Sequence, residues 1–164
     1  MAVDSSRPLV IYLAGHIHST WRNDLRSSAE ARELPIRFAG PVEDHGLSDN
    51  VGVKLFKISK GYGGAHHEKL RDELSGAINS VRAEVLIANS DLVLAYFDAE
   101  HGNLRQWSPS SDIATACASG KPMILVADGS LGHALKEVRQ HARVWVYTLE
   151  QALDLISYIT TDEI

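Results

Sequence analysis

The chain has 164 residues, 45% of them hydrophobic, and 16 Lys and Arg against 21 Asp and Glu give a net charge of −5 with histidine neutral. A chain of this length buries roughly 70% of the surface that its unfolded form exposes, so its core needs neither disulfides nor a structural metal. Cys117 is the single cysteine, which fits a reducing compartment. The acidic balance disfavours duplex nucleic acid as a partner. With no apolar run long enough for a bilayer and no secretory signal, we expect one cytoplasmic domain over residues 1–164 that binds no membrane.

Short apolar segments alternate with longer segments of helical period along the chain. This alternation is typical of a parallel sheet covered by helices. The predicted strands are 9–14, 36–39, 92–97, 123–127 and 144–147. The predicted helices are 20–32, 68–88, 112–119, 133–141 and 149–159, the last capped by Thr148. In the helix 68–88, one apolar stripe at steps of three and four residues is expected to face the sheet, and its members are Leu70, Leu74, Ile78, Val81 and Val85.

Five strands joined by right-handed crossovers predict an α/β fold, a flavodoxin-like three-layer sandwich with strand order 2-1-3-4-5. Ligands of such sheets bind outside the carboxyl ends of the strands, so we expect a crevice walled by residues 15–19 and 98–111. The segment 40–67 has little periodicity and holds six of the twelve glycines. Connections of this length are uncommon in compact domains, which predicts a long loop that closes over the crevice as a lid.

The familiar nucleotide-binding fingerprints, GxGxxG and GxxxxGK[ST], are absent. His16 and His18 stand at the mouth of the predicted crevice, where neutral imidazoles can bind a transition metal. Asp44, His45 and Asp49 are the available further ligands, although no HExxH or CxxC motif fixes their spacing. We favour hydrogen-bonding loop histidines and keep a small metal-dependent hydrolase as an alternative.

Asp112 is placed at the start of a predicted helix, where the macrodipole favours an ionised carboxylate. This is the state that a nucleophile or a general base requires. Helix capping is the competing interpretation of the same position. Ser108, Ser110 and Ser111, with the free amides of the helix end, are suited to a phosphate or to sugar hydroxyls, and Trp107 either stacks on a base or packs in the core.

Several segments together resemble a known family. They are IYLAG at 11–15, DLVLA at 91–95, and a carboxylate eight positions before the GKP of 120–122, and these resemble the nucleoside 2-deoxyribosyltransferase superfamily. Within that superfamily, HSTWR at 18–22, GPVEDH at 40–45, SDN at 48–50 and QW at 106–107 resemble the YtoQ family. The resemblance covers nearly the whole chain.

The resemblance implies N-glycosidic chemistry on a nucleoside or nucleotide, with no cofactor and no metal. In the superfamily a Glu attacks the anomeric carbon and a Tyr of the first strand holds it, and the matching residues here are Asp112 and Tyr12. Asp is one methylene shorter than Glu, which leaves room for a water and for hydrolysis with inversion. The superfamily's Asp that protonates the base falls on Ala83, so the acid is expected from Asp44, His45 or Asp49.

The resemblance also implies that members assemble as homo-oligomers that complete their sites across subunits. The remaining expected substrate contacts are Gly15, His16, His18, Pro41, Asp44, Asn50, Asp98 and Trp107. Because of the departures at Asp112 and Ala83, a noncatalytic nucleotide-binding domain on the same fold stays open as an alternative.

Overall fold

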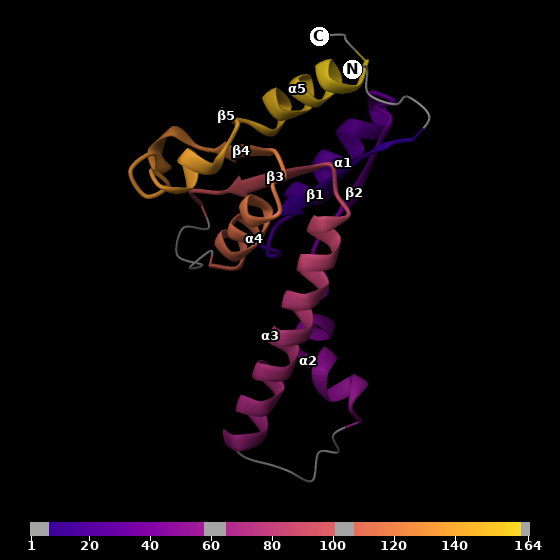
Figure 1. Ribbon diagram of the computed structural model, residues 1–164, viewed down its shortest axis with the longest axis vertical. Coiled ribbons are helices and arrows are strands. Elements are labelled where there is room, and N and C mark those ends of the chain that lie inside the picture. The colour runs from indigo at the N-terminus through magenta and orange to yellow at the C-terminus, as the bar shows by residue number, and fades with distance from the viewer. Residues whose placement is uncertain (1–6, 58–64, 101–106, 162–164) are drawn as a thin grey trace.

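The computed structural model describes residues 7–57, 65–100 and 107–161. Its strands β1 (Leu9–Ala14), β2 (Ile36–Ala39), β3 (Leu92–Phe97), β4 (Met123–Ala127) and β5 (Val144–Val146) form one parallel sheet in the order β2-β1-β3-β4-β5 (Figure 1). The helices are α1 (Trp21–Ala31), α2 (His45–Leu55), α3 (Ala65–Ala88), α4 (Trp107–Ala118) and α5 (Leu149–Thr161). The predicted strand positions and the flavodoxin-like order are confirmed. Within the described ranges, no helix is long and apolar enough to cross a membrane.

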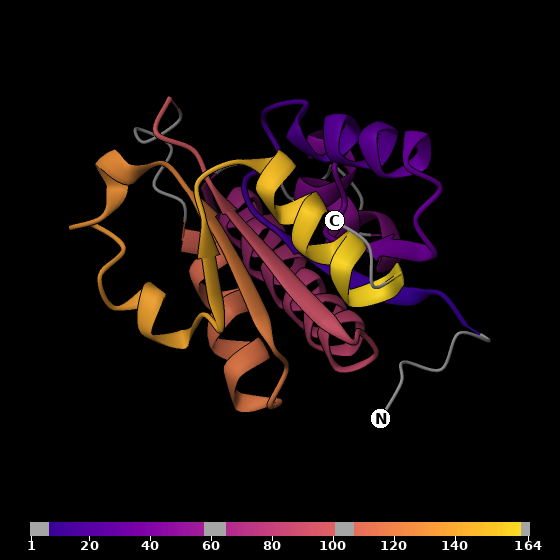
Figure 2. The same cartoon turned by 90° about the horizontal axis from the view of Figure 1, so that it is seen from above.

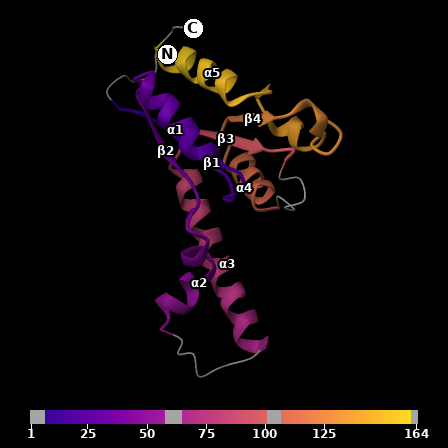
Figure 3. The same cartoon turned by 180° about the vertical axis from the view of Figure 1, so that it is seen from behind.

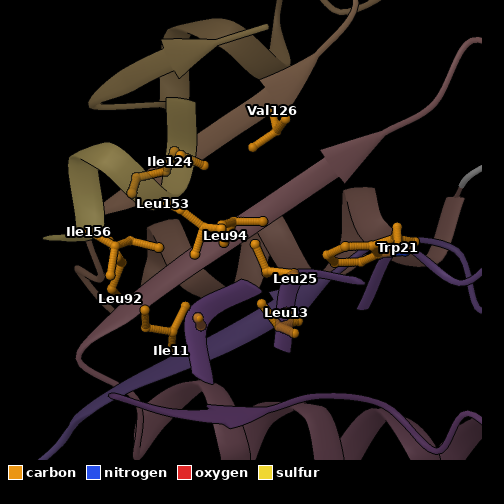
Figure 4. Packing of buried hydrophobic residues seen from close by; sticks show 12 residues of the cluster. Ile11, Leu13, Trp21, Leu25, Leu92, Leu94, Ile124, Val126, Leu153 and Ile156 are labelled. Carbon is orange, nitrogen blue, oxygen red and sulfur yellow. The ribbon is translucent and has the colours of Figure 1, made fainter. Parts of the chain in front are cut away.

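The sheet is covered on both faces because its central strands send alternate side chains to opposite sides. Ile11 and Leu13 of β1 pack with α1 and α5, and Figure 4 shows this cluster with Trp21 and Leu25 on one side and Leu153 and Ile156 on the other. Tyr12 and Ala14 point to the opposite face, toward α3 and α4. Figure 2 shows α5 and α1 lying over one face of the sheet. The side chain of Tyr12 is therefore delivered to the α4 side by strand geometry alone.

The start of α5 and the end of α4 have the capping residues that the sequence predicted. Thr148 Oγ1 accepts from the backbone N–H of Gln151 at 3.2 Å, and Gln151 Oε1 accepts from the N–H of Tyr147 at 2.8 Å, which is a reciprocal helix cap. Gly120 follows α4 with φ +66°, a conformation that glycine adopts without strain. The predicted helix 133–141 is corrected to two short 3-10 segments, Gly129–Leu131 and Val138–His141.

The expected lid loop over 40–67 is wrong, because α2 lies inside it. Asp44 caps this helix by accepting from the N–H of Leu47 at 2.8 Å. The glycines that suggested a loop include Gly46 and Gly52, which are both helical residues. Gly52 allows a close crossing of two helices, since a Cβ there lies 2.6 Å from Leu74 Cβ and 3.0 Å from the N of Ser75. Residues 58–64 lie outside the described residues.

We name α2 and the N-terminal part of α3 the α2–α3 arm, which extends away from the sheet in Figures 1 and 3. Polar groups join the two helices. Ser75 Oγ donates to the carbonyl of Asp49 at 2.8 Å, and Asn79 Nδ2 donates to the carbonyl of Ser48 at 3.1 Å. The predicted stripe of α3 does not pack on the sheet along its whole length, since Val81 and Val85 are 60% and 54% exposed. Ile87, at the C-terminal end of α3, packs on the sheet instead, because the rest of the helix extends beyond the sheet edge.

Replacing Gly52 with Ala is expected to destabilise the arm, because the new methyl group meets backbone atoms of α3 that cannot rotate away. Overpacking of this kind costs about 1–3 kcal/mol in the free energy of unfolding. Gly76→Ala is the matched control, since a Cβ at Gly76 has no neighbour within 4 Å and alanine raises helix stability by about 0.5–1 kcal/mol. Urea unfolding of both variants measures the two effects, and a Gly52→Ala protein as stable as wild type would contradict the tight crossing.

Candidate active site

A cavity of about 740 Å³ opens at the carboxyl ends of β1 and β2, between the β1–α1 loop, the α2–α3 arm and α4. Its position agrees with the crevice expected for this strand order. Nine of the residues expected in the site line it, and they are Tyr12, Gly15, His16, His18, Pro41, Asp49, Ser108, Ser111 and Asp112. Ala83 also lines it. The sequence therefore predicted much of one wall of the cavity.

Asp112 and Tyr12 form the centre of this cavity. The Tyr12 hydroxyl donates to Asp112 Oδ2 at 3.2 Å, and the two residues are 100 positions apart in the chain. Tyr12 is fully buried. The phenol orients one carboxylate oxygen and leaves the second oxygen of Asp112 for a ligand, which is an arrangement suited to nucleophilic or base chemistry.

The helical environment of Asp112 differs from the expected one. Because α4 begins at Trp107, with Pro109 in its first turn, Asp112 is its sixth residue and neither caps the helix nor lies in its first turn. The macrodipole argument therefore fails. Burial raises the pKa of Asp112 to about 6, against smaller lowering effects of the Tyr12 hydrogen bond and the Arg22 charge. At neutral pH the carboxylate is mostly ionised but poorly solvated, a condition that raises its reactivity.

Charges around the pair act on both partners. Burial, with Asp112 next to it, raises the pKa of Tyr12 far above its ordinary value, so Tyr12 stays a neutral hydrogen-bond donor. Arg22 and Arg82 oppose that rise. A neutral Tyr beside an ionised Asp is the protonation pattern that keeps the 3.2 Å hydrogen bond intact through neutral pH.

The contacts of the His16 ring do not fit a metal ligand. Its Nδ1 accepts from the backbone N–H of His18 at 3.3 Å, so the ring proton is on Nε2, which lies 3.6 Å from Asp98 Oδ2. Both nitrogens thus face protein atoms. Asp98 pairs with His16 and does not line the cavity. In the part of the chain that the structure describes, no three His, Cys, Asp or Glu side chains gather as a metal site.

The acids and histidine expected from segment 44–50 have different places. Asp44 is the cap of α2, and Asn50 Nδ2 donates to the carbonyl of Gly46 at 2.7 Å, so both serve that helix. His45 Nδ1 lies 2.9 Å from Asp49 Oδ2, and the ring of His45 is 5.3 Å from that of His18. Asp49 and His18 line the cavity, so the His45–Asp49 pair stands at its edge. Ser110 lies on α4 without lining the cavity, and the Trp107 side chain lies outside the described residues.

The cavity wall along α3 was missed by sequence reasoning. Its polar members are Arg71, Asp72, Ser75, Asn79, Ser80 and Arg82. The signal was present, because positions 71, 75, 79 and 82 recur at helical spacing and define a polar face beside the apolar stripe, one position after each of its first four members. Such a face is usually attributed to solvent. Here it faces the cavity because α3 passes along the carboxyl edge of the sheet.

A doubly wound parallel sheet with a buried carboxylate and a phenol at its carboxyl edge defines a flavodoxin-like α/β protein with a candidate carboxylate active site. The family model described as "Nucleoside 2-deoxyribosyltransferase YtoQ" matches residues 12–160. The chain belongs to this family, as the resemblance predicted.

Two known proteins are similar to this chain. "Uncharacterized protein YtoQ" of Bacillus subtilis (strain 168) is 36% identical over 154 residues, which cover 94% of this chain and 98% of that protein. Among solved structures, a 2-deoxyribosyltransferase from Bacillus psychrosaccharolyticus matches 88% of this chain and 90% of its own, with a TM-score of 0.44 and 11% identity. The similarity to the Bacillus subtilis protein thus spans nearly the full length of both chains.

Proposed function

We propose that the chain is a metal-independent enzyme that breaks the N-glycosidic bond of a nucleoside or nucleoside monophosphate, or transfers its deoxyribosyl group, with Asp112 as the reacting carboxylate. The observation that carries the proposal is the hydrogen bond from Tyr12 to Asp112 in a cavity at the carboxyl edge of the sheet. The family description supports the substrate class. A cavity of about 740 Å³ is within the usual range for small-molecule sites, about 300–1,000 Å³.

Asp112 supports two routes with different bonds formed. In transfer, its free oxygen bonds to the anomeric carbon, the bond from that carbon to the base nitrogen breaks, and a second base or water later displaces the carboxylate. In hydrolysis, Asp112 takes a proton from water while the water oxygen bonds to the anomeric carbon. In both routes the electron pair of the broken bond goes to the base nitrogen, which then needs a proton.

The His45–Asp49 pair is the proposed source of that proton. Asp49 lines the cavity, and its Oδ2 lies 2.9 Å from His45 Nδ1, so the two side chains can share a proton at the edge of the cavity. Asp72 also lines the cavity, but from α3, where its Oδ1 forms an ion pair with Arg71 Nη2 at 3.1 Å. We therefore assign the acid to α2 and an electrostatic role to Asp72.

The test of the proposed function is release of free base from a panel of deoxynucleosides and their 5′-monophosphates, followed by chromatography with and without a chelator. We expect release from at least one purine or pyrimidine substrate, unchanged by chelation, because no metal-bound water is required. The configuration of the released sugar, read by proton NMR, assigns the route: inversion indicates direct attack by water, and retention a glycosyl-enzyme. Loss of release on chelation with recovery on zinc would favour the metal hydrolase, and binding without release a noncatalytic domain.

Asp112→Glu separates the two routes by side-chain length. A longer side chain brings the carboxylate closer to the anomeric carbon, so transfer to an acceptor base is kept or raised if attack is direct. It removes the room for water if the wild type hydrolyses. Opposite changes in transfer and hydrolysis are therefore the result that assigns the mechanism.

Replacing Asp49 with Asn is expected to lower base release from ordinary purine deoxynucleosides by about 10²-fold or more, the usual contribution of a positioned acid. A 7-methylated purine carries its positive charge already and leaves without a proton, so release from that substrate is expected to change little. Asp72→Asn is the matched control, since Asp72 lines the same cavity from α3. Equal losses on both substrates would contradict the acid role of the His45–Asp49 pair.

We also propose that copies of this chain associate through exposed apolar side chains of α2 and α3. Of the eight large apolar side chains described as exposed, five lie on α2, its end and α3, namely Leu47, Leu55, Phe56, Val81 and Val85. Exposed apolar side chains concentrated on two packed helices commonly mark an interaction surface. The arm also forms one wall of the cavity, so association there would close the site from outside.

Light scattering on the purified protein is expected to report an assembly rather than an 18.0 kDa monomer. The double variant Val81→Glu with Val85→Glu is expected to shift the mass toward the monomer, because charge on both positions disfavours burial of this face. Tyr158→Glu is the control, since Tyr158 is similarly exposed, at 54%, but lies on α5. A wild-type monomer at working concentration would remove the assembly from the proposal.

A further inference from the structure

Arg22 lies behind the candidate site and is not used by the reaction outlined above. Its side chain, from the first turn of α1, is 1% exposed. Nη1 donates to the carbonyl of His16 at 2.7 Å, and Nη2 donates to the carbonyls of Gly15 at 2.7 Å and Leu13 at 3.3 Å. Trp21 Nε1 donates to the same carbonyl of His16 at 3.0 Å. Two neighbouring side chains thus hold the backbone at the end of β1, where the wall of the cavity begins.

The environment of Arg22 is unfavourable for a residue that serves only folding. A buried guanidinium is expensive unless a carboxylate pairs with it. In the described part of the chain no carboxylate forms an ion pair with Arg22, and its Nε has no hydrogen-bond partner there. Burial lowers the pKa of Arg22 to about 10, so the group remains charged at neutral pH. Costly polar groups of this kind are expected at functional sites.

We propose that Arg22 is a positioning residue of the candidate site, which fixes the β1–α1 loop through three backbone carbonyls and supplies a buried positive charge behind Tyr12 and Asp112. The first role follows from these hydrogen bonds, because His16 and His18 lie on the backbone segment that Arg22 holds. An effect of the second role on catalysis rests on the proposed function. The position of Arg22 and its hydrogen bonds do not depend on that function.

The electrostatic role has named participants on each neighbouring element. Asp112 of α4 faces Tyr12 of β1, and the charge of Arg22 on α1 acts on Asp112. The charges of Arg22 and of Arg82 on α3 both act on Tyr12. Arg22 lowers the pKa of both members of the pair. Glu43 is the acid whose charge most favours ionised Arg22, and it pairs with Arg26, not with Arg22. Loss of the Arg22 charge is therefore expected to make ionisation of Asp112 harder.

Arginine is needed for the first role because its planar fork reaches several acceptors at once, whereas the lysine ammonium is a compact point charge. Arg22→Lys therefore keeps the charge and loses part of the clamp, while Arg22→Gln loses the charge as well. Arg32→Gln is the matched control: Arg32 ends the same helix but pairs with Asp154 at 2.6 Å on α5. The three variants separate positioning from charge.

The experiment follows the carboxyl carbon of Asp112 by NMR in protein labelled with ¹³C-aspartate, with the signal assigned from Asp112→Asn. We expect Arg22→Gln to move the Asp112 titration upward, because the charge of Arg22 lowers the pKa of Asp112 in the wild type. Arg22→Lys is expected to leave the titration near its wild-type midpoint but to speed amide hydrogen exchange in residues 15–19. Arg32→Gln is expected to change neither measurement.

These readouts need no substrate, so they are decided even if no base release is found. A folded Arg22→Gln protein with an unchanged Asp112 titration would overturn the electrostatic role. Unchanged exchange in Arg22→Lys would overturn the clamp. If Arg22→Gln does not fold, Arg22→Lys carries the test of the clamp, and Asp112→Asn carries that of the charge. The charge of Asp112 raises the pKa of Arg22 in the wild type, so its removal is expected to lower the Arg22 titration followed by NMR of the guanidinium group. Absence of that shift overturns the electrostatic role. Where base release is found, its pH midpoint is expected to follow the Asp112 titration in every variant.

Discussion

Asp112→Asn is expected to lower base release by a factor on the order of 10⁴, because an amide can neither attack the anomeric carbon nor take a proton from water. Asn keeps the size of the side chain and an oxygen that accepts from the Tyr12 hydroxyl, which lies 3.2 Å from Asp112 Oδ2 in the wild type. The loss can therefore be assigned to chemistry and not to rearrangement. Chromatography of free base over long incubations measures it with the best substrate of the panel.

The control for this experiment is Asp154→Asn. Asp154 lies on α5, on the far side of the sheet from the cavity, where it accepts from Arg32 at 2.6 Å. The same change from acid to amide there is expected to leave base release within twofold of wild type. An Asp112→Asn protein that folds normally and keeps full activity would leave Asp112 without a catalytic role and would end the site assignment.

The strands were predictable from the sequence because their burial is a local property. β1, β3 and β4 are buried on both faces, so each reads as a continuous apolar segment without help from its neighbours. The strand order followed from the alternation of strands and helices and from the handedness of crossovers. α2 was missed for the opposite reason. It packs by a glycine crossing and by polar bonds from Ser75 and Asn79, which a search for a buried apolar stripe does not detect.

The site was predictable only where it lies on strands and their immediate loops. Tyr12 was found by resemblance, Asp112 by its place near a predicted helix start and by resemblance, and their hydrogen bond agrees with both assignments. The electrostatics of Asp112 were not predictable, because its burial depends on how α4 packs over the sheet and on where that helix begins. The polar face of α3 was not predictable either, since nothing local distinguishes a face that lines a cavity from a face in water. Tertiary placement decides both.

Asp112→Asn is also expected to make the protein more stable, which is unusual for a residue hydrogen-bonded in its cavity. The folded-state pKa of Asp112, about 6, lies above its ordinary value of 3.8, so the folded protein binds the proton more tightly than the unfolded chain does. Stability therefore falls as the pH rises through this window, and above about pH 6 the wild type loses up to about 3 kcal/mol. Asn carries no such penalty, so the variant is expected to gain most of this amount at pH 8.

Urea unfolding at pH 4 and pH 8 measures the gain, which is expected to be small at pH 4 because Asp112 is then protonated in the folded state. Asp91→Asn is the control of opposite sign. The pKa of Asp91 is lowered, first by its hydrogen bond to Arg7, so its ionised form stabilises the fold above its ordinary pKa and this contribution is lost on acidification. Its amide variant is expected to be less stable than wild type at pH 8. A difference between Asp112→Asn and wild type that is the same at both pH values would contradict the burial of ionised Asp112, because only a titrating group makes that difference depend on pH.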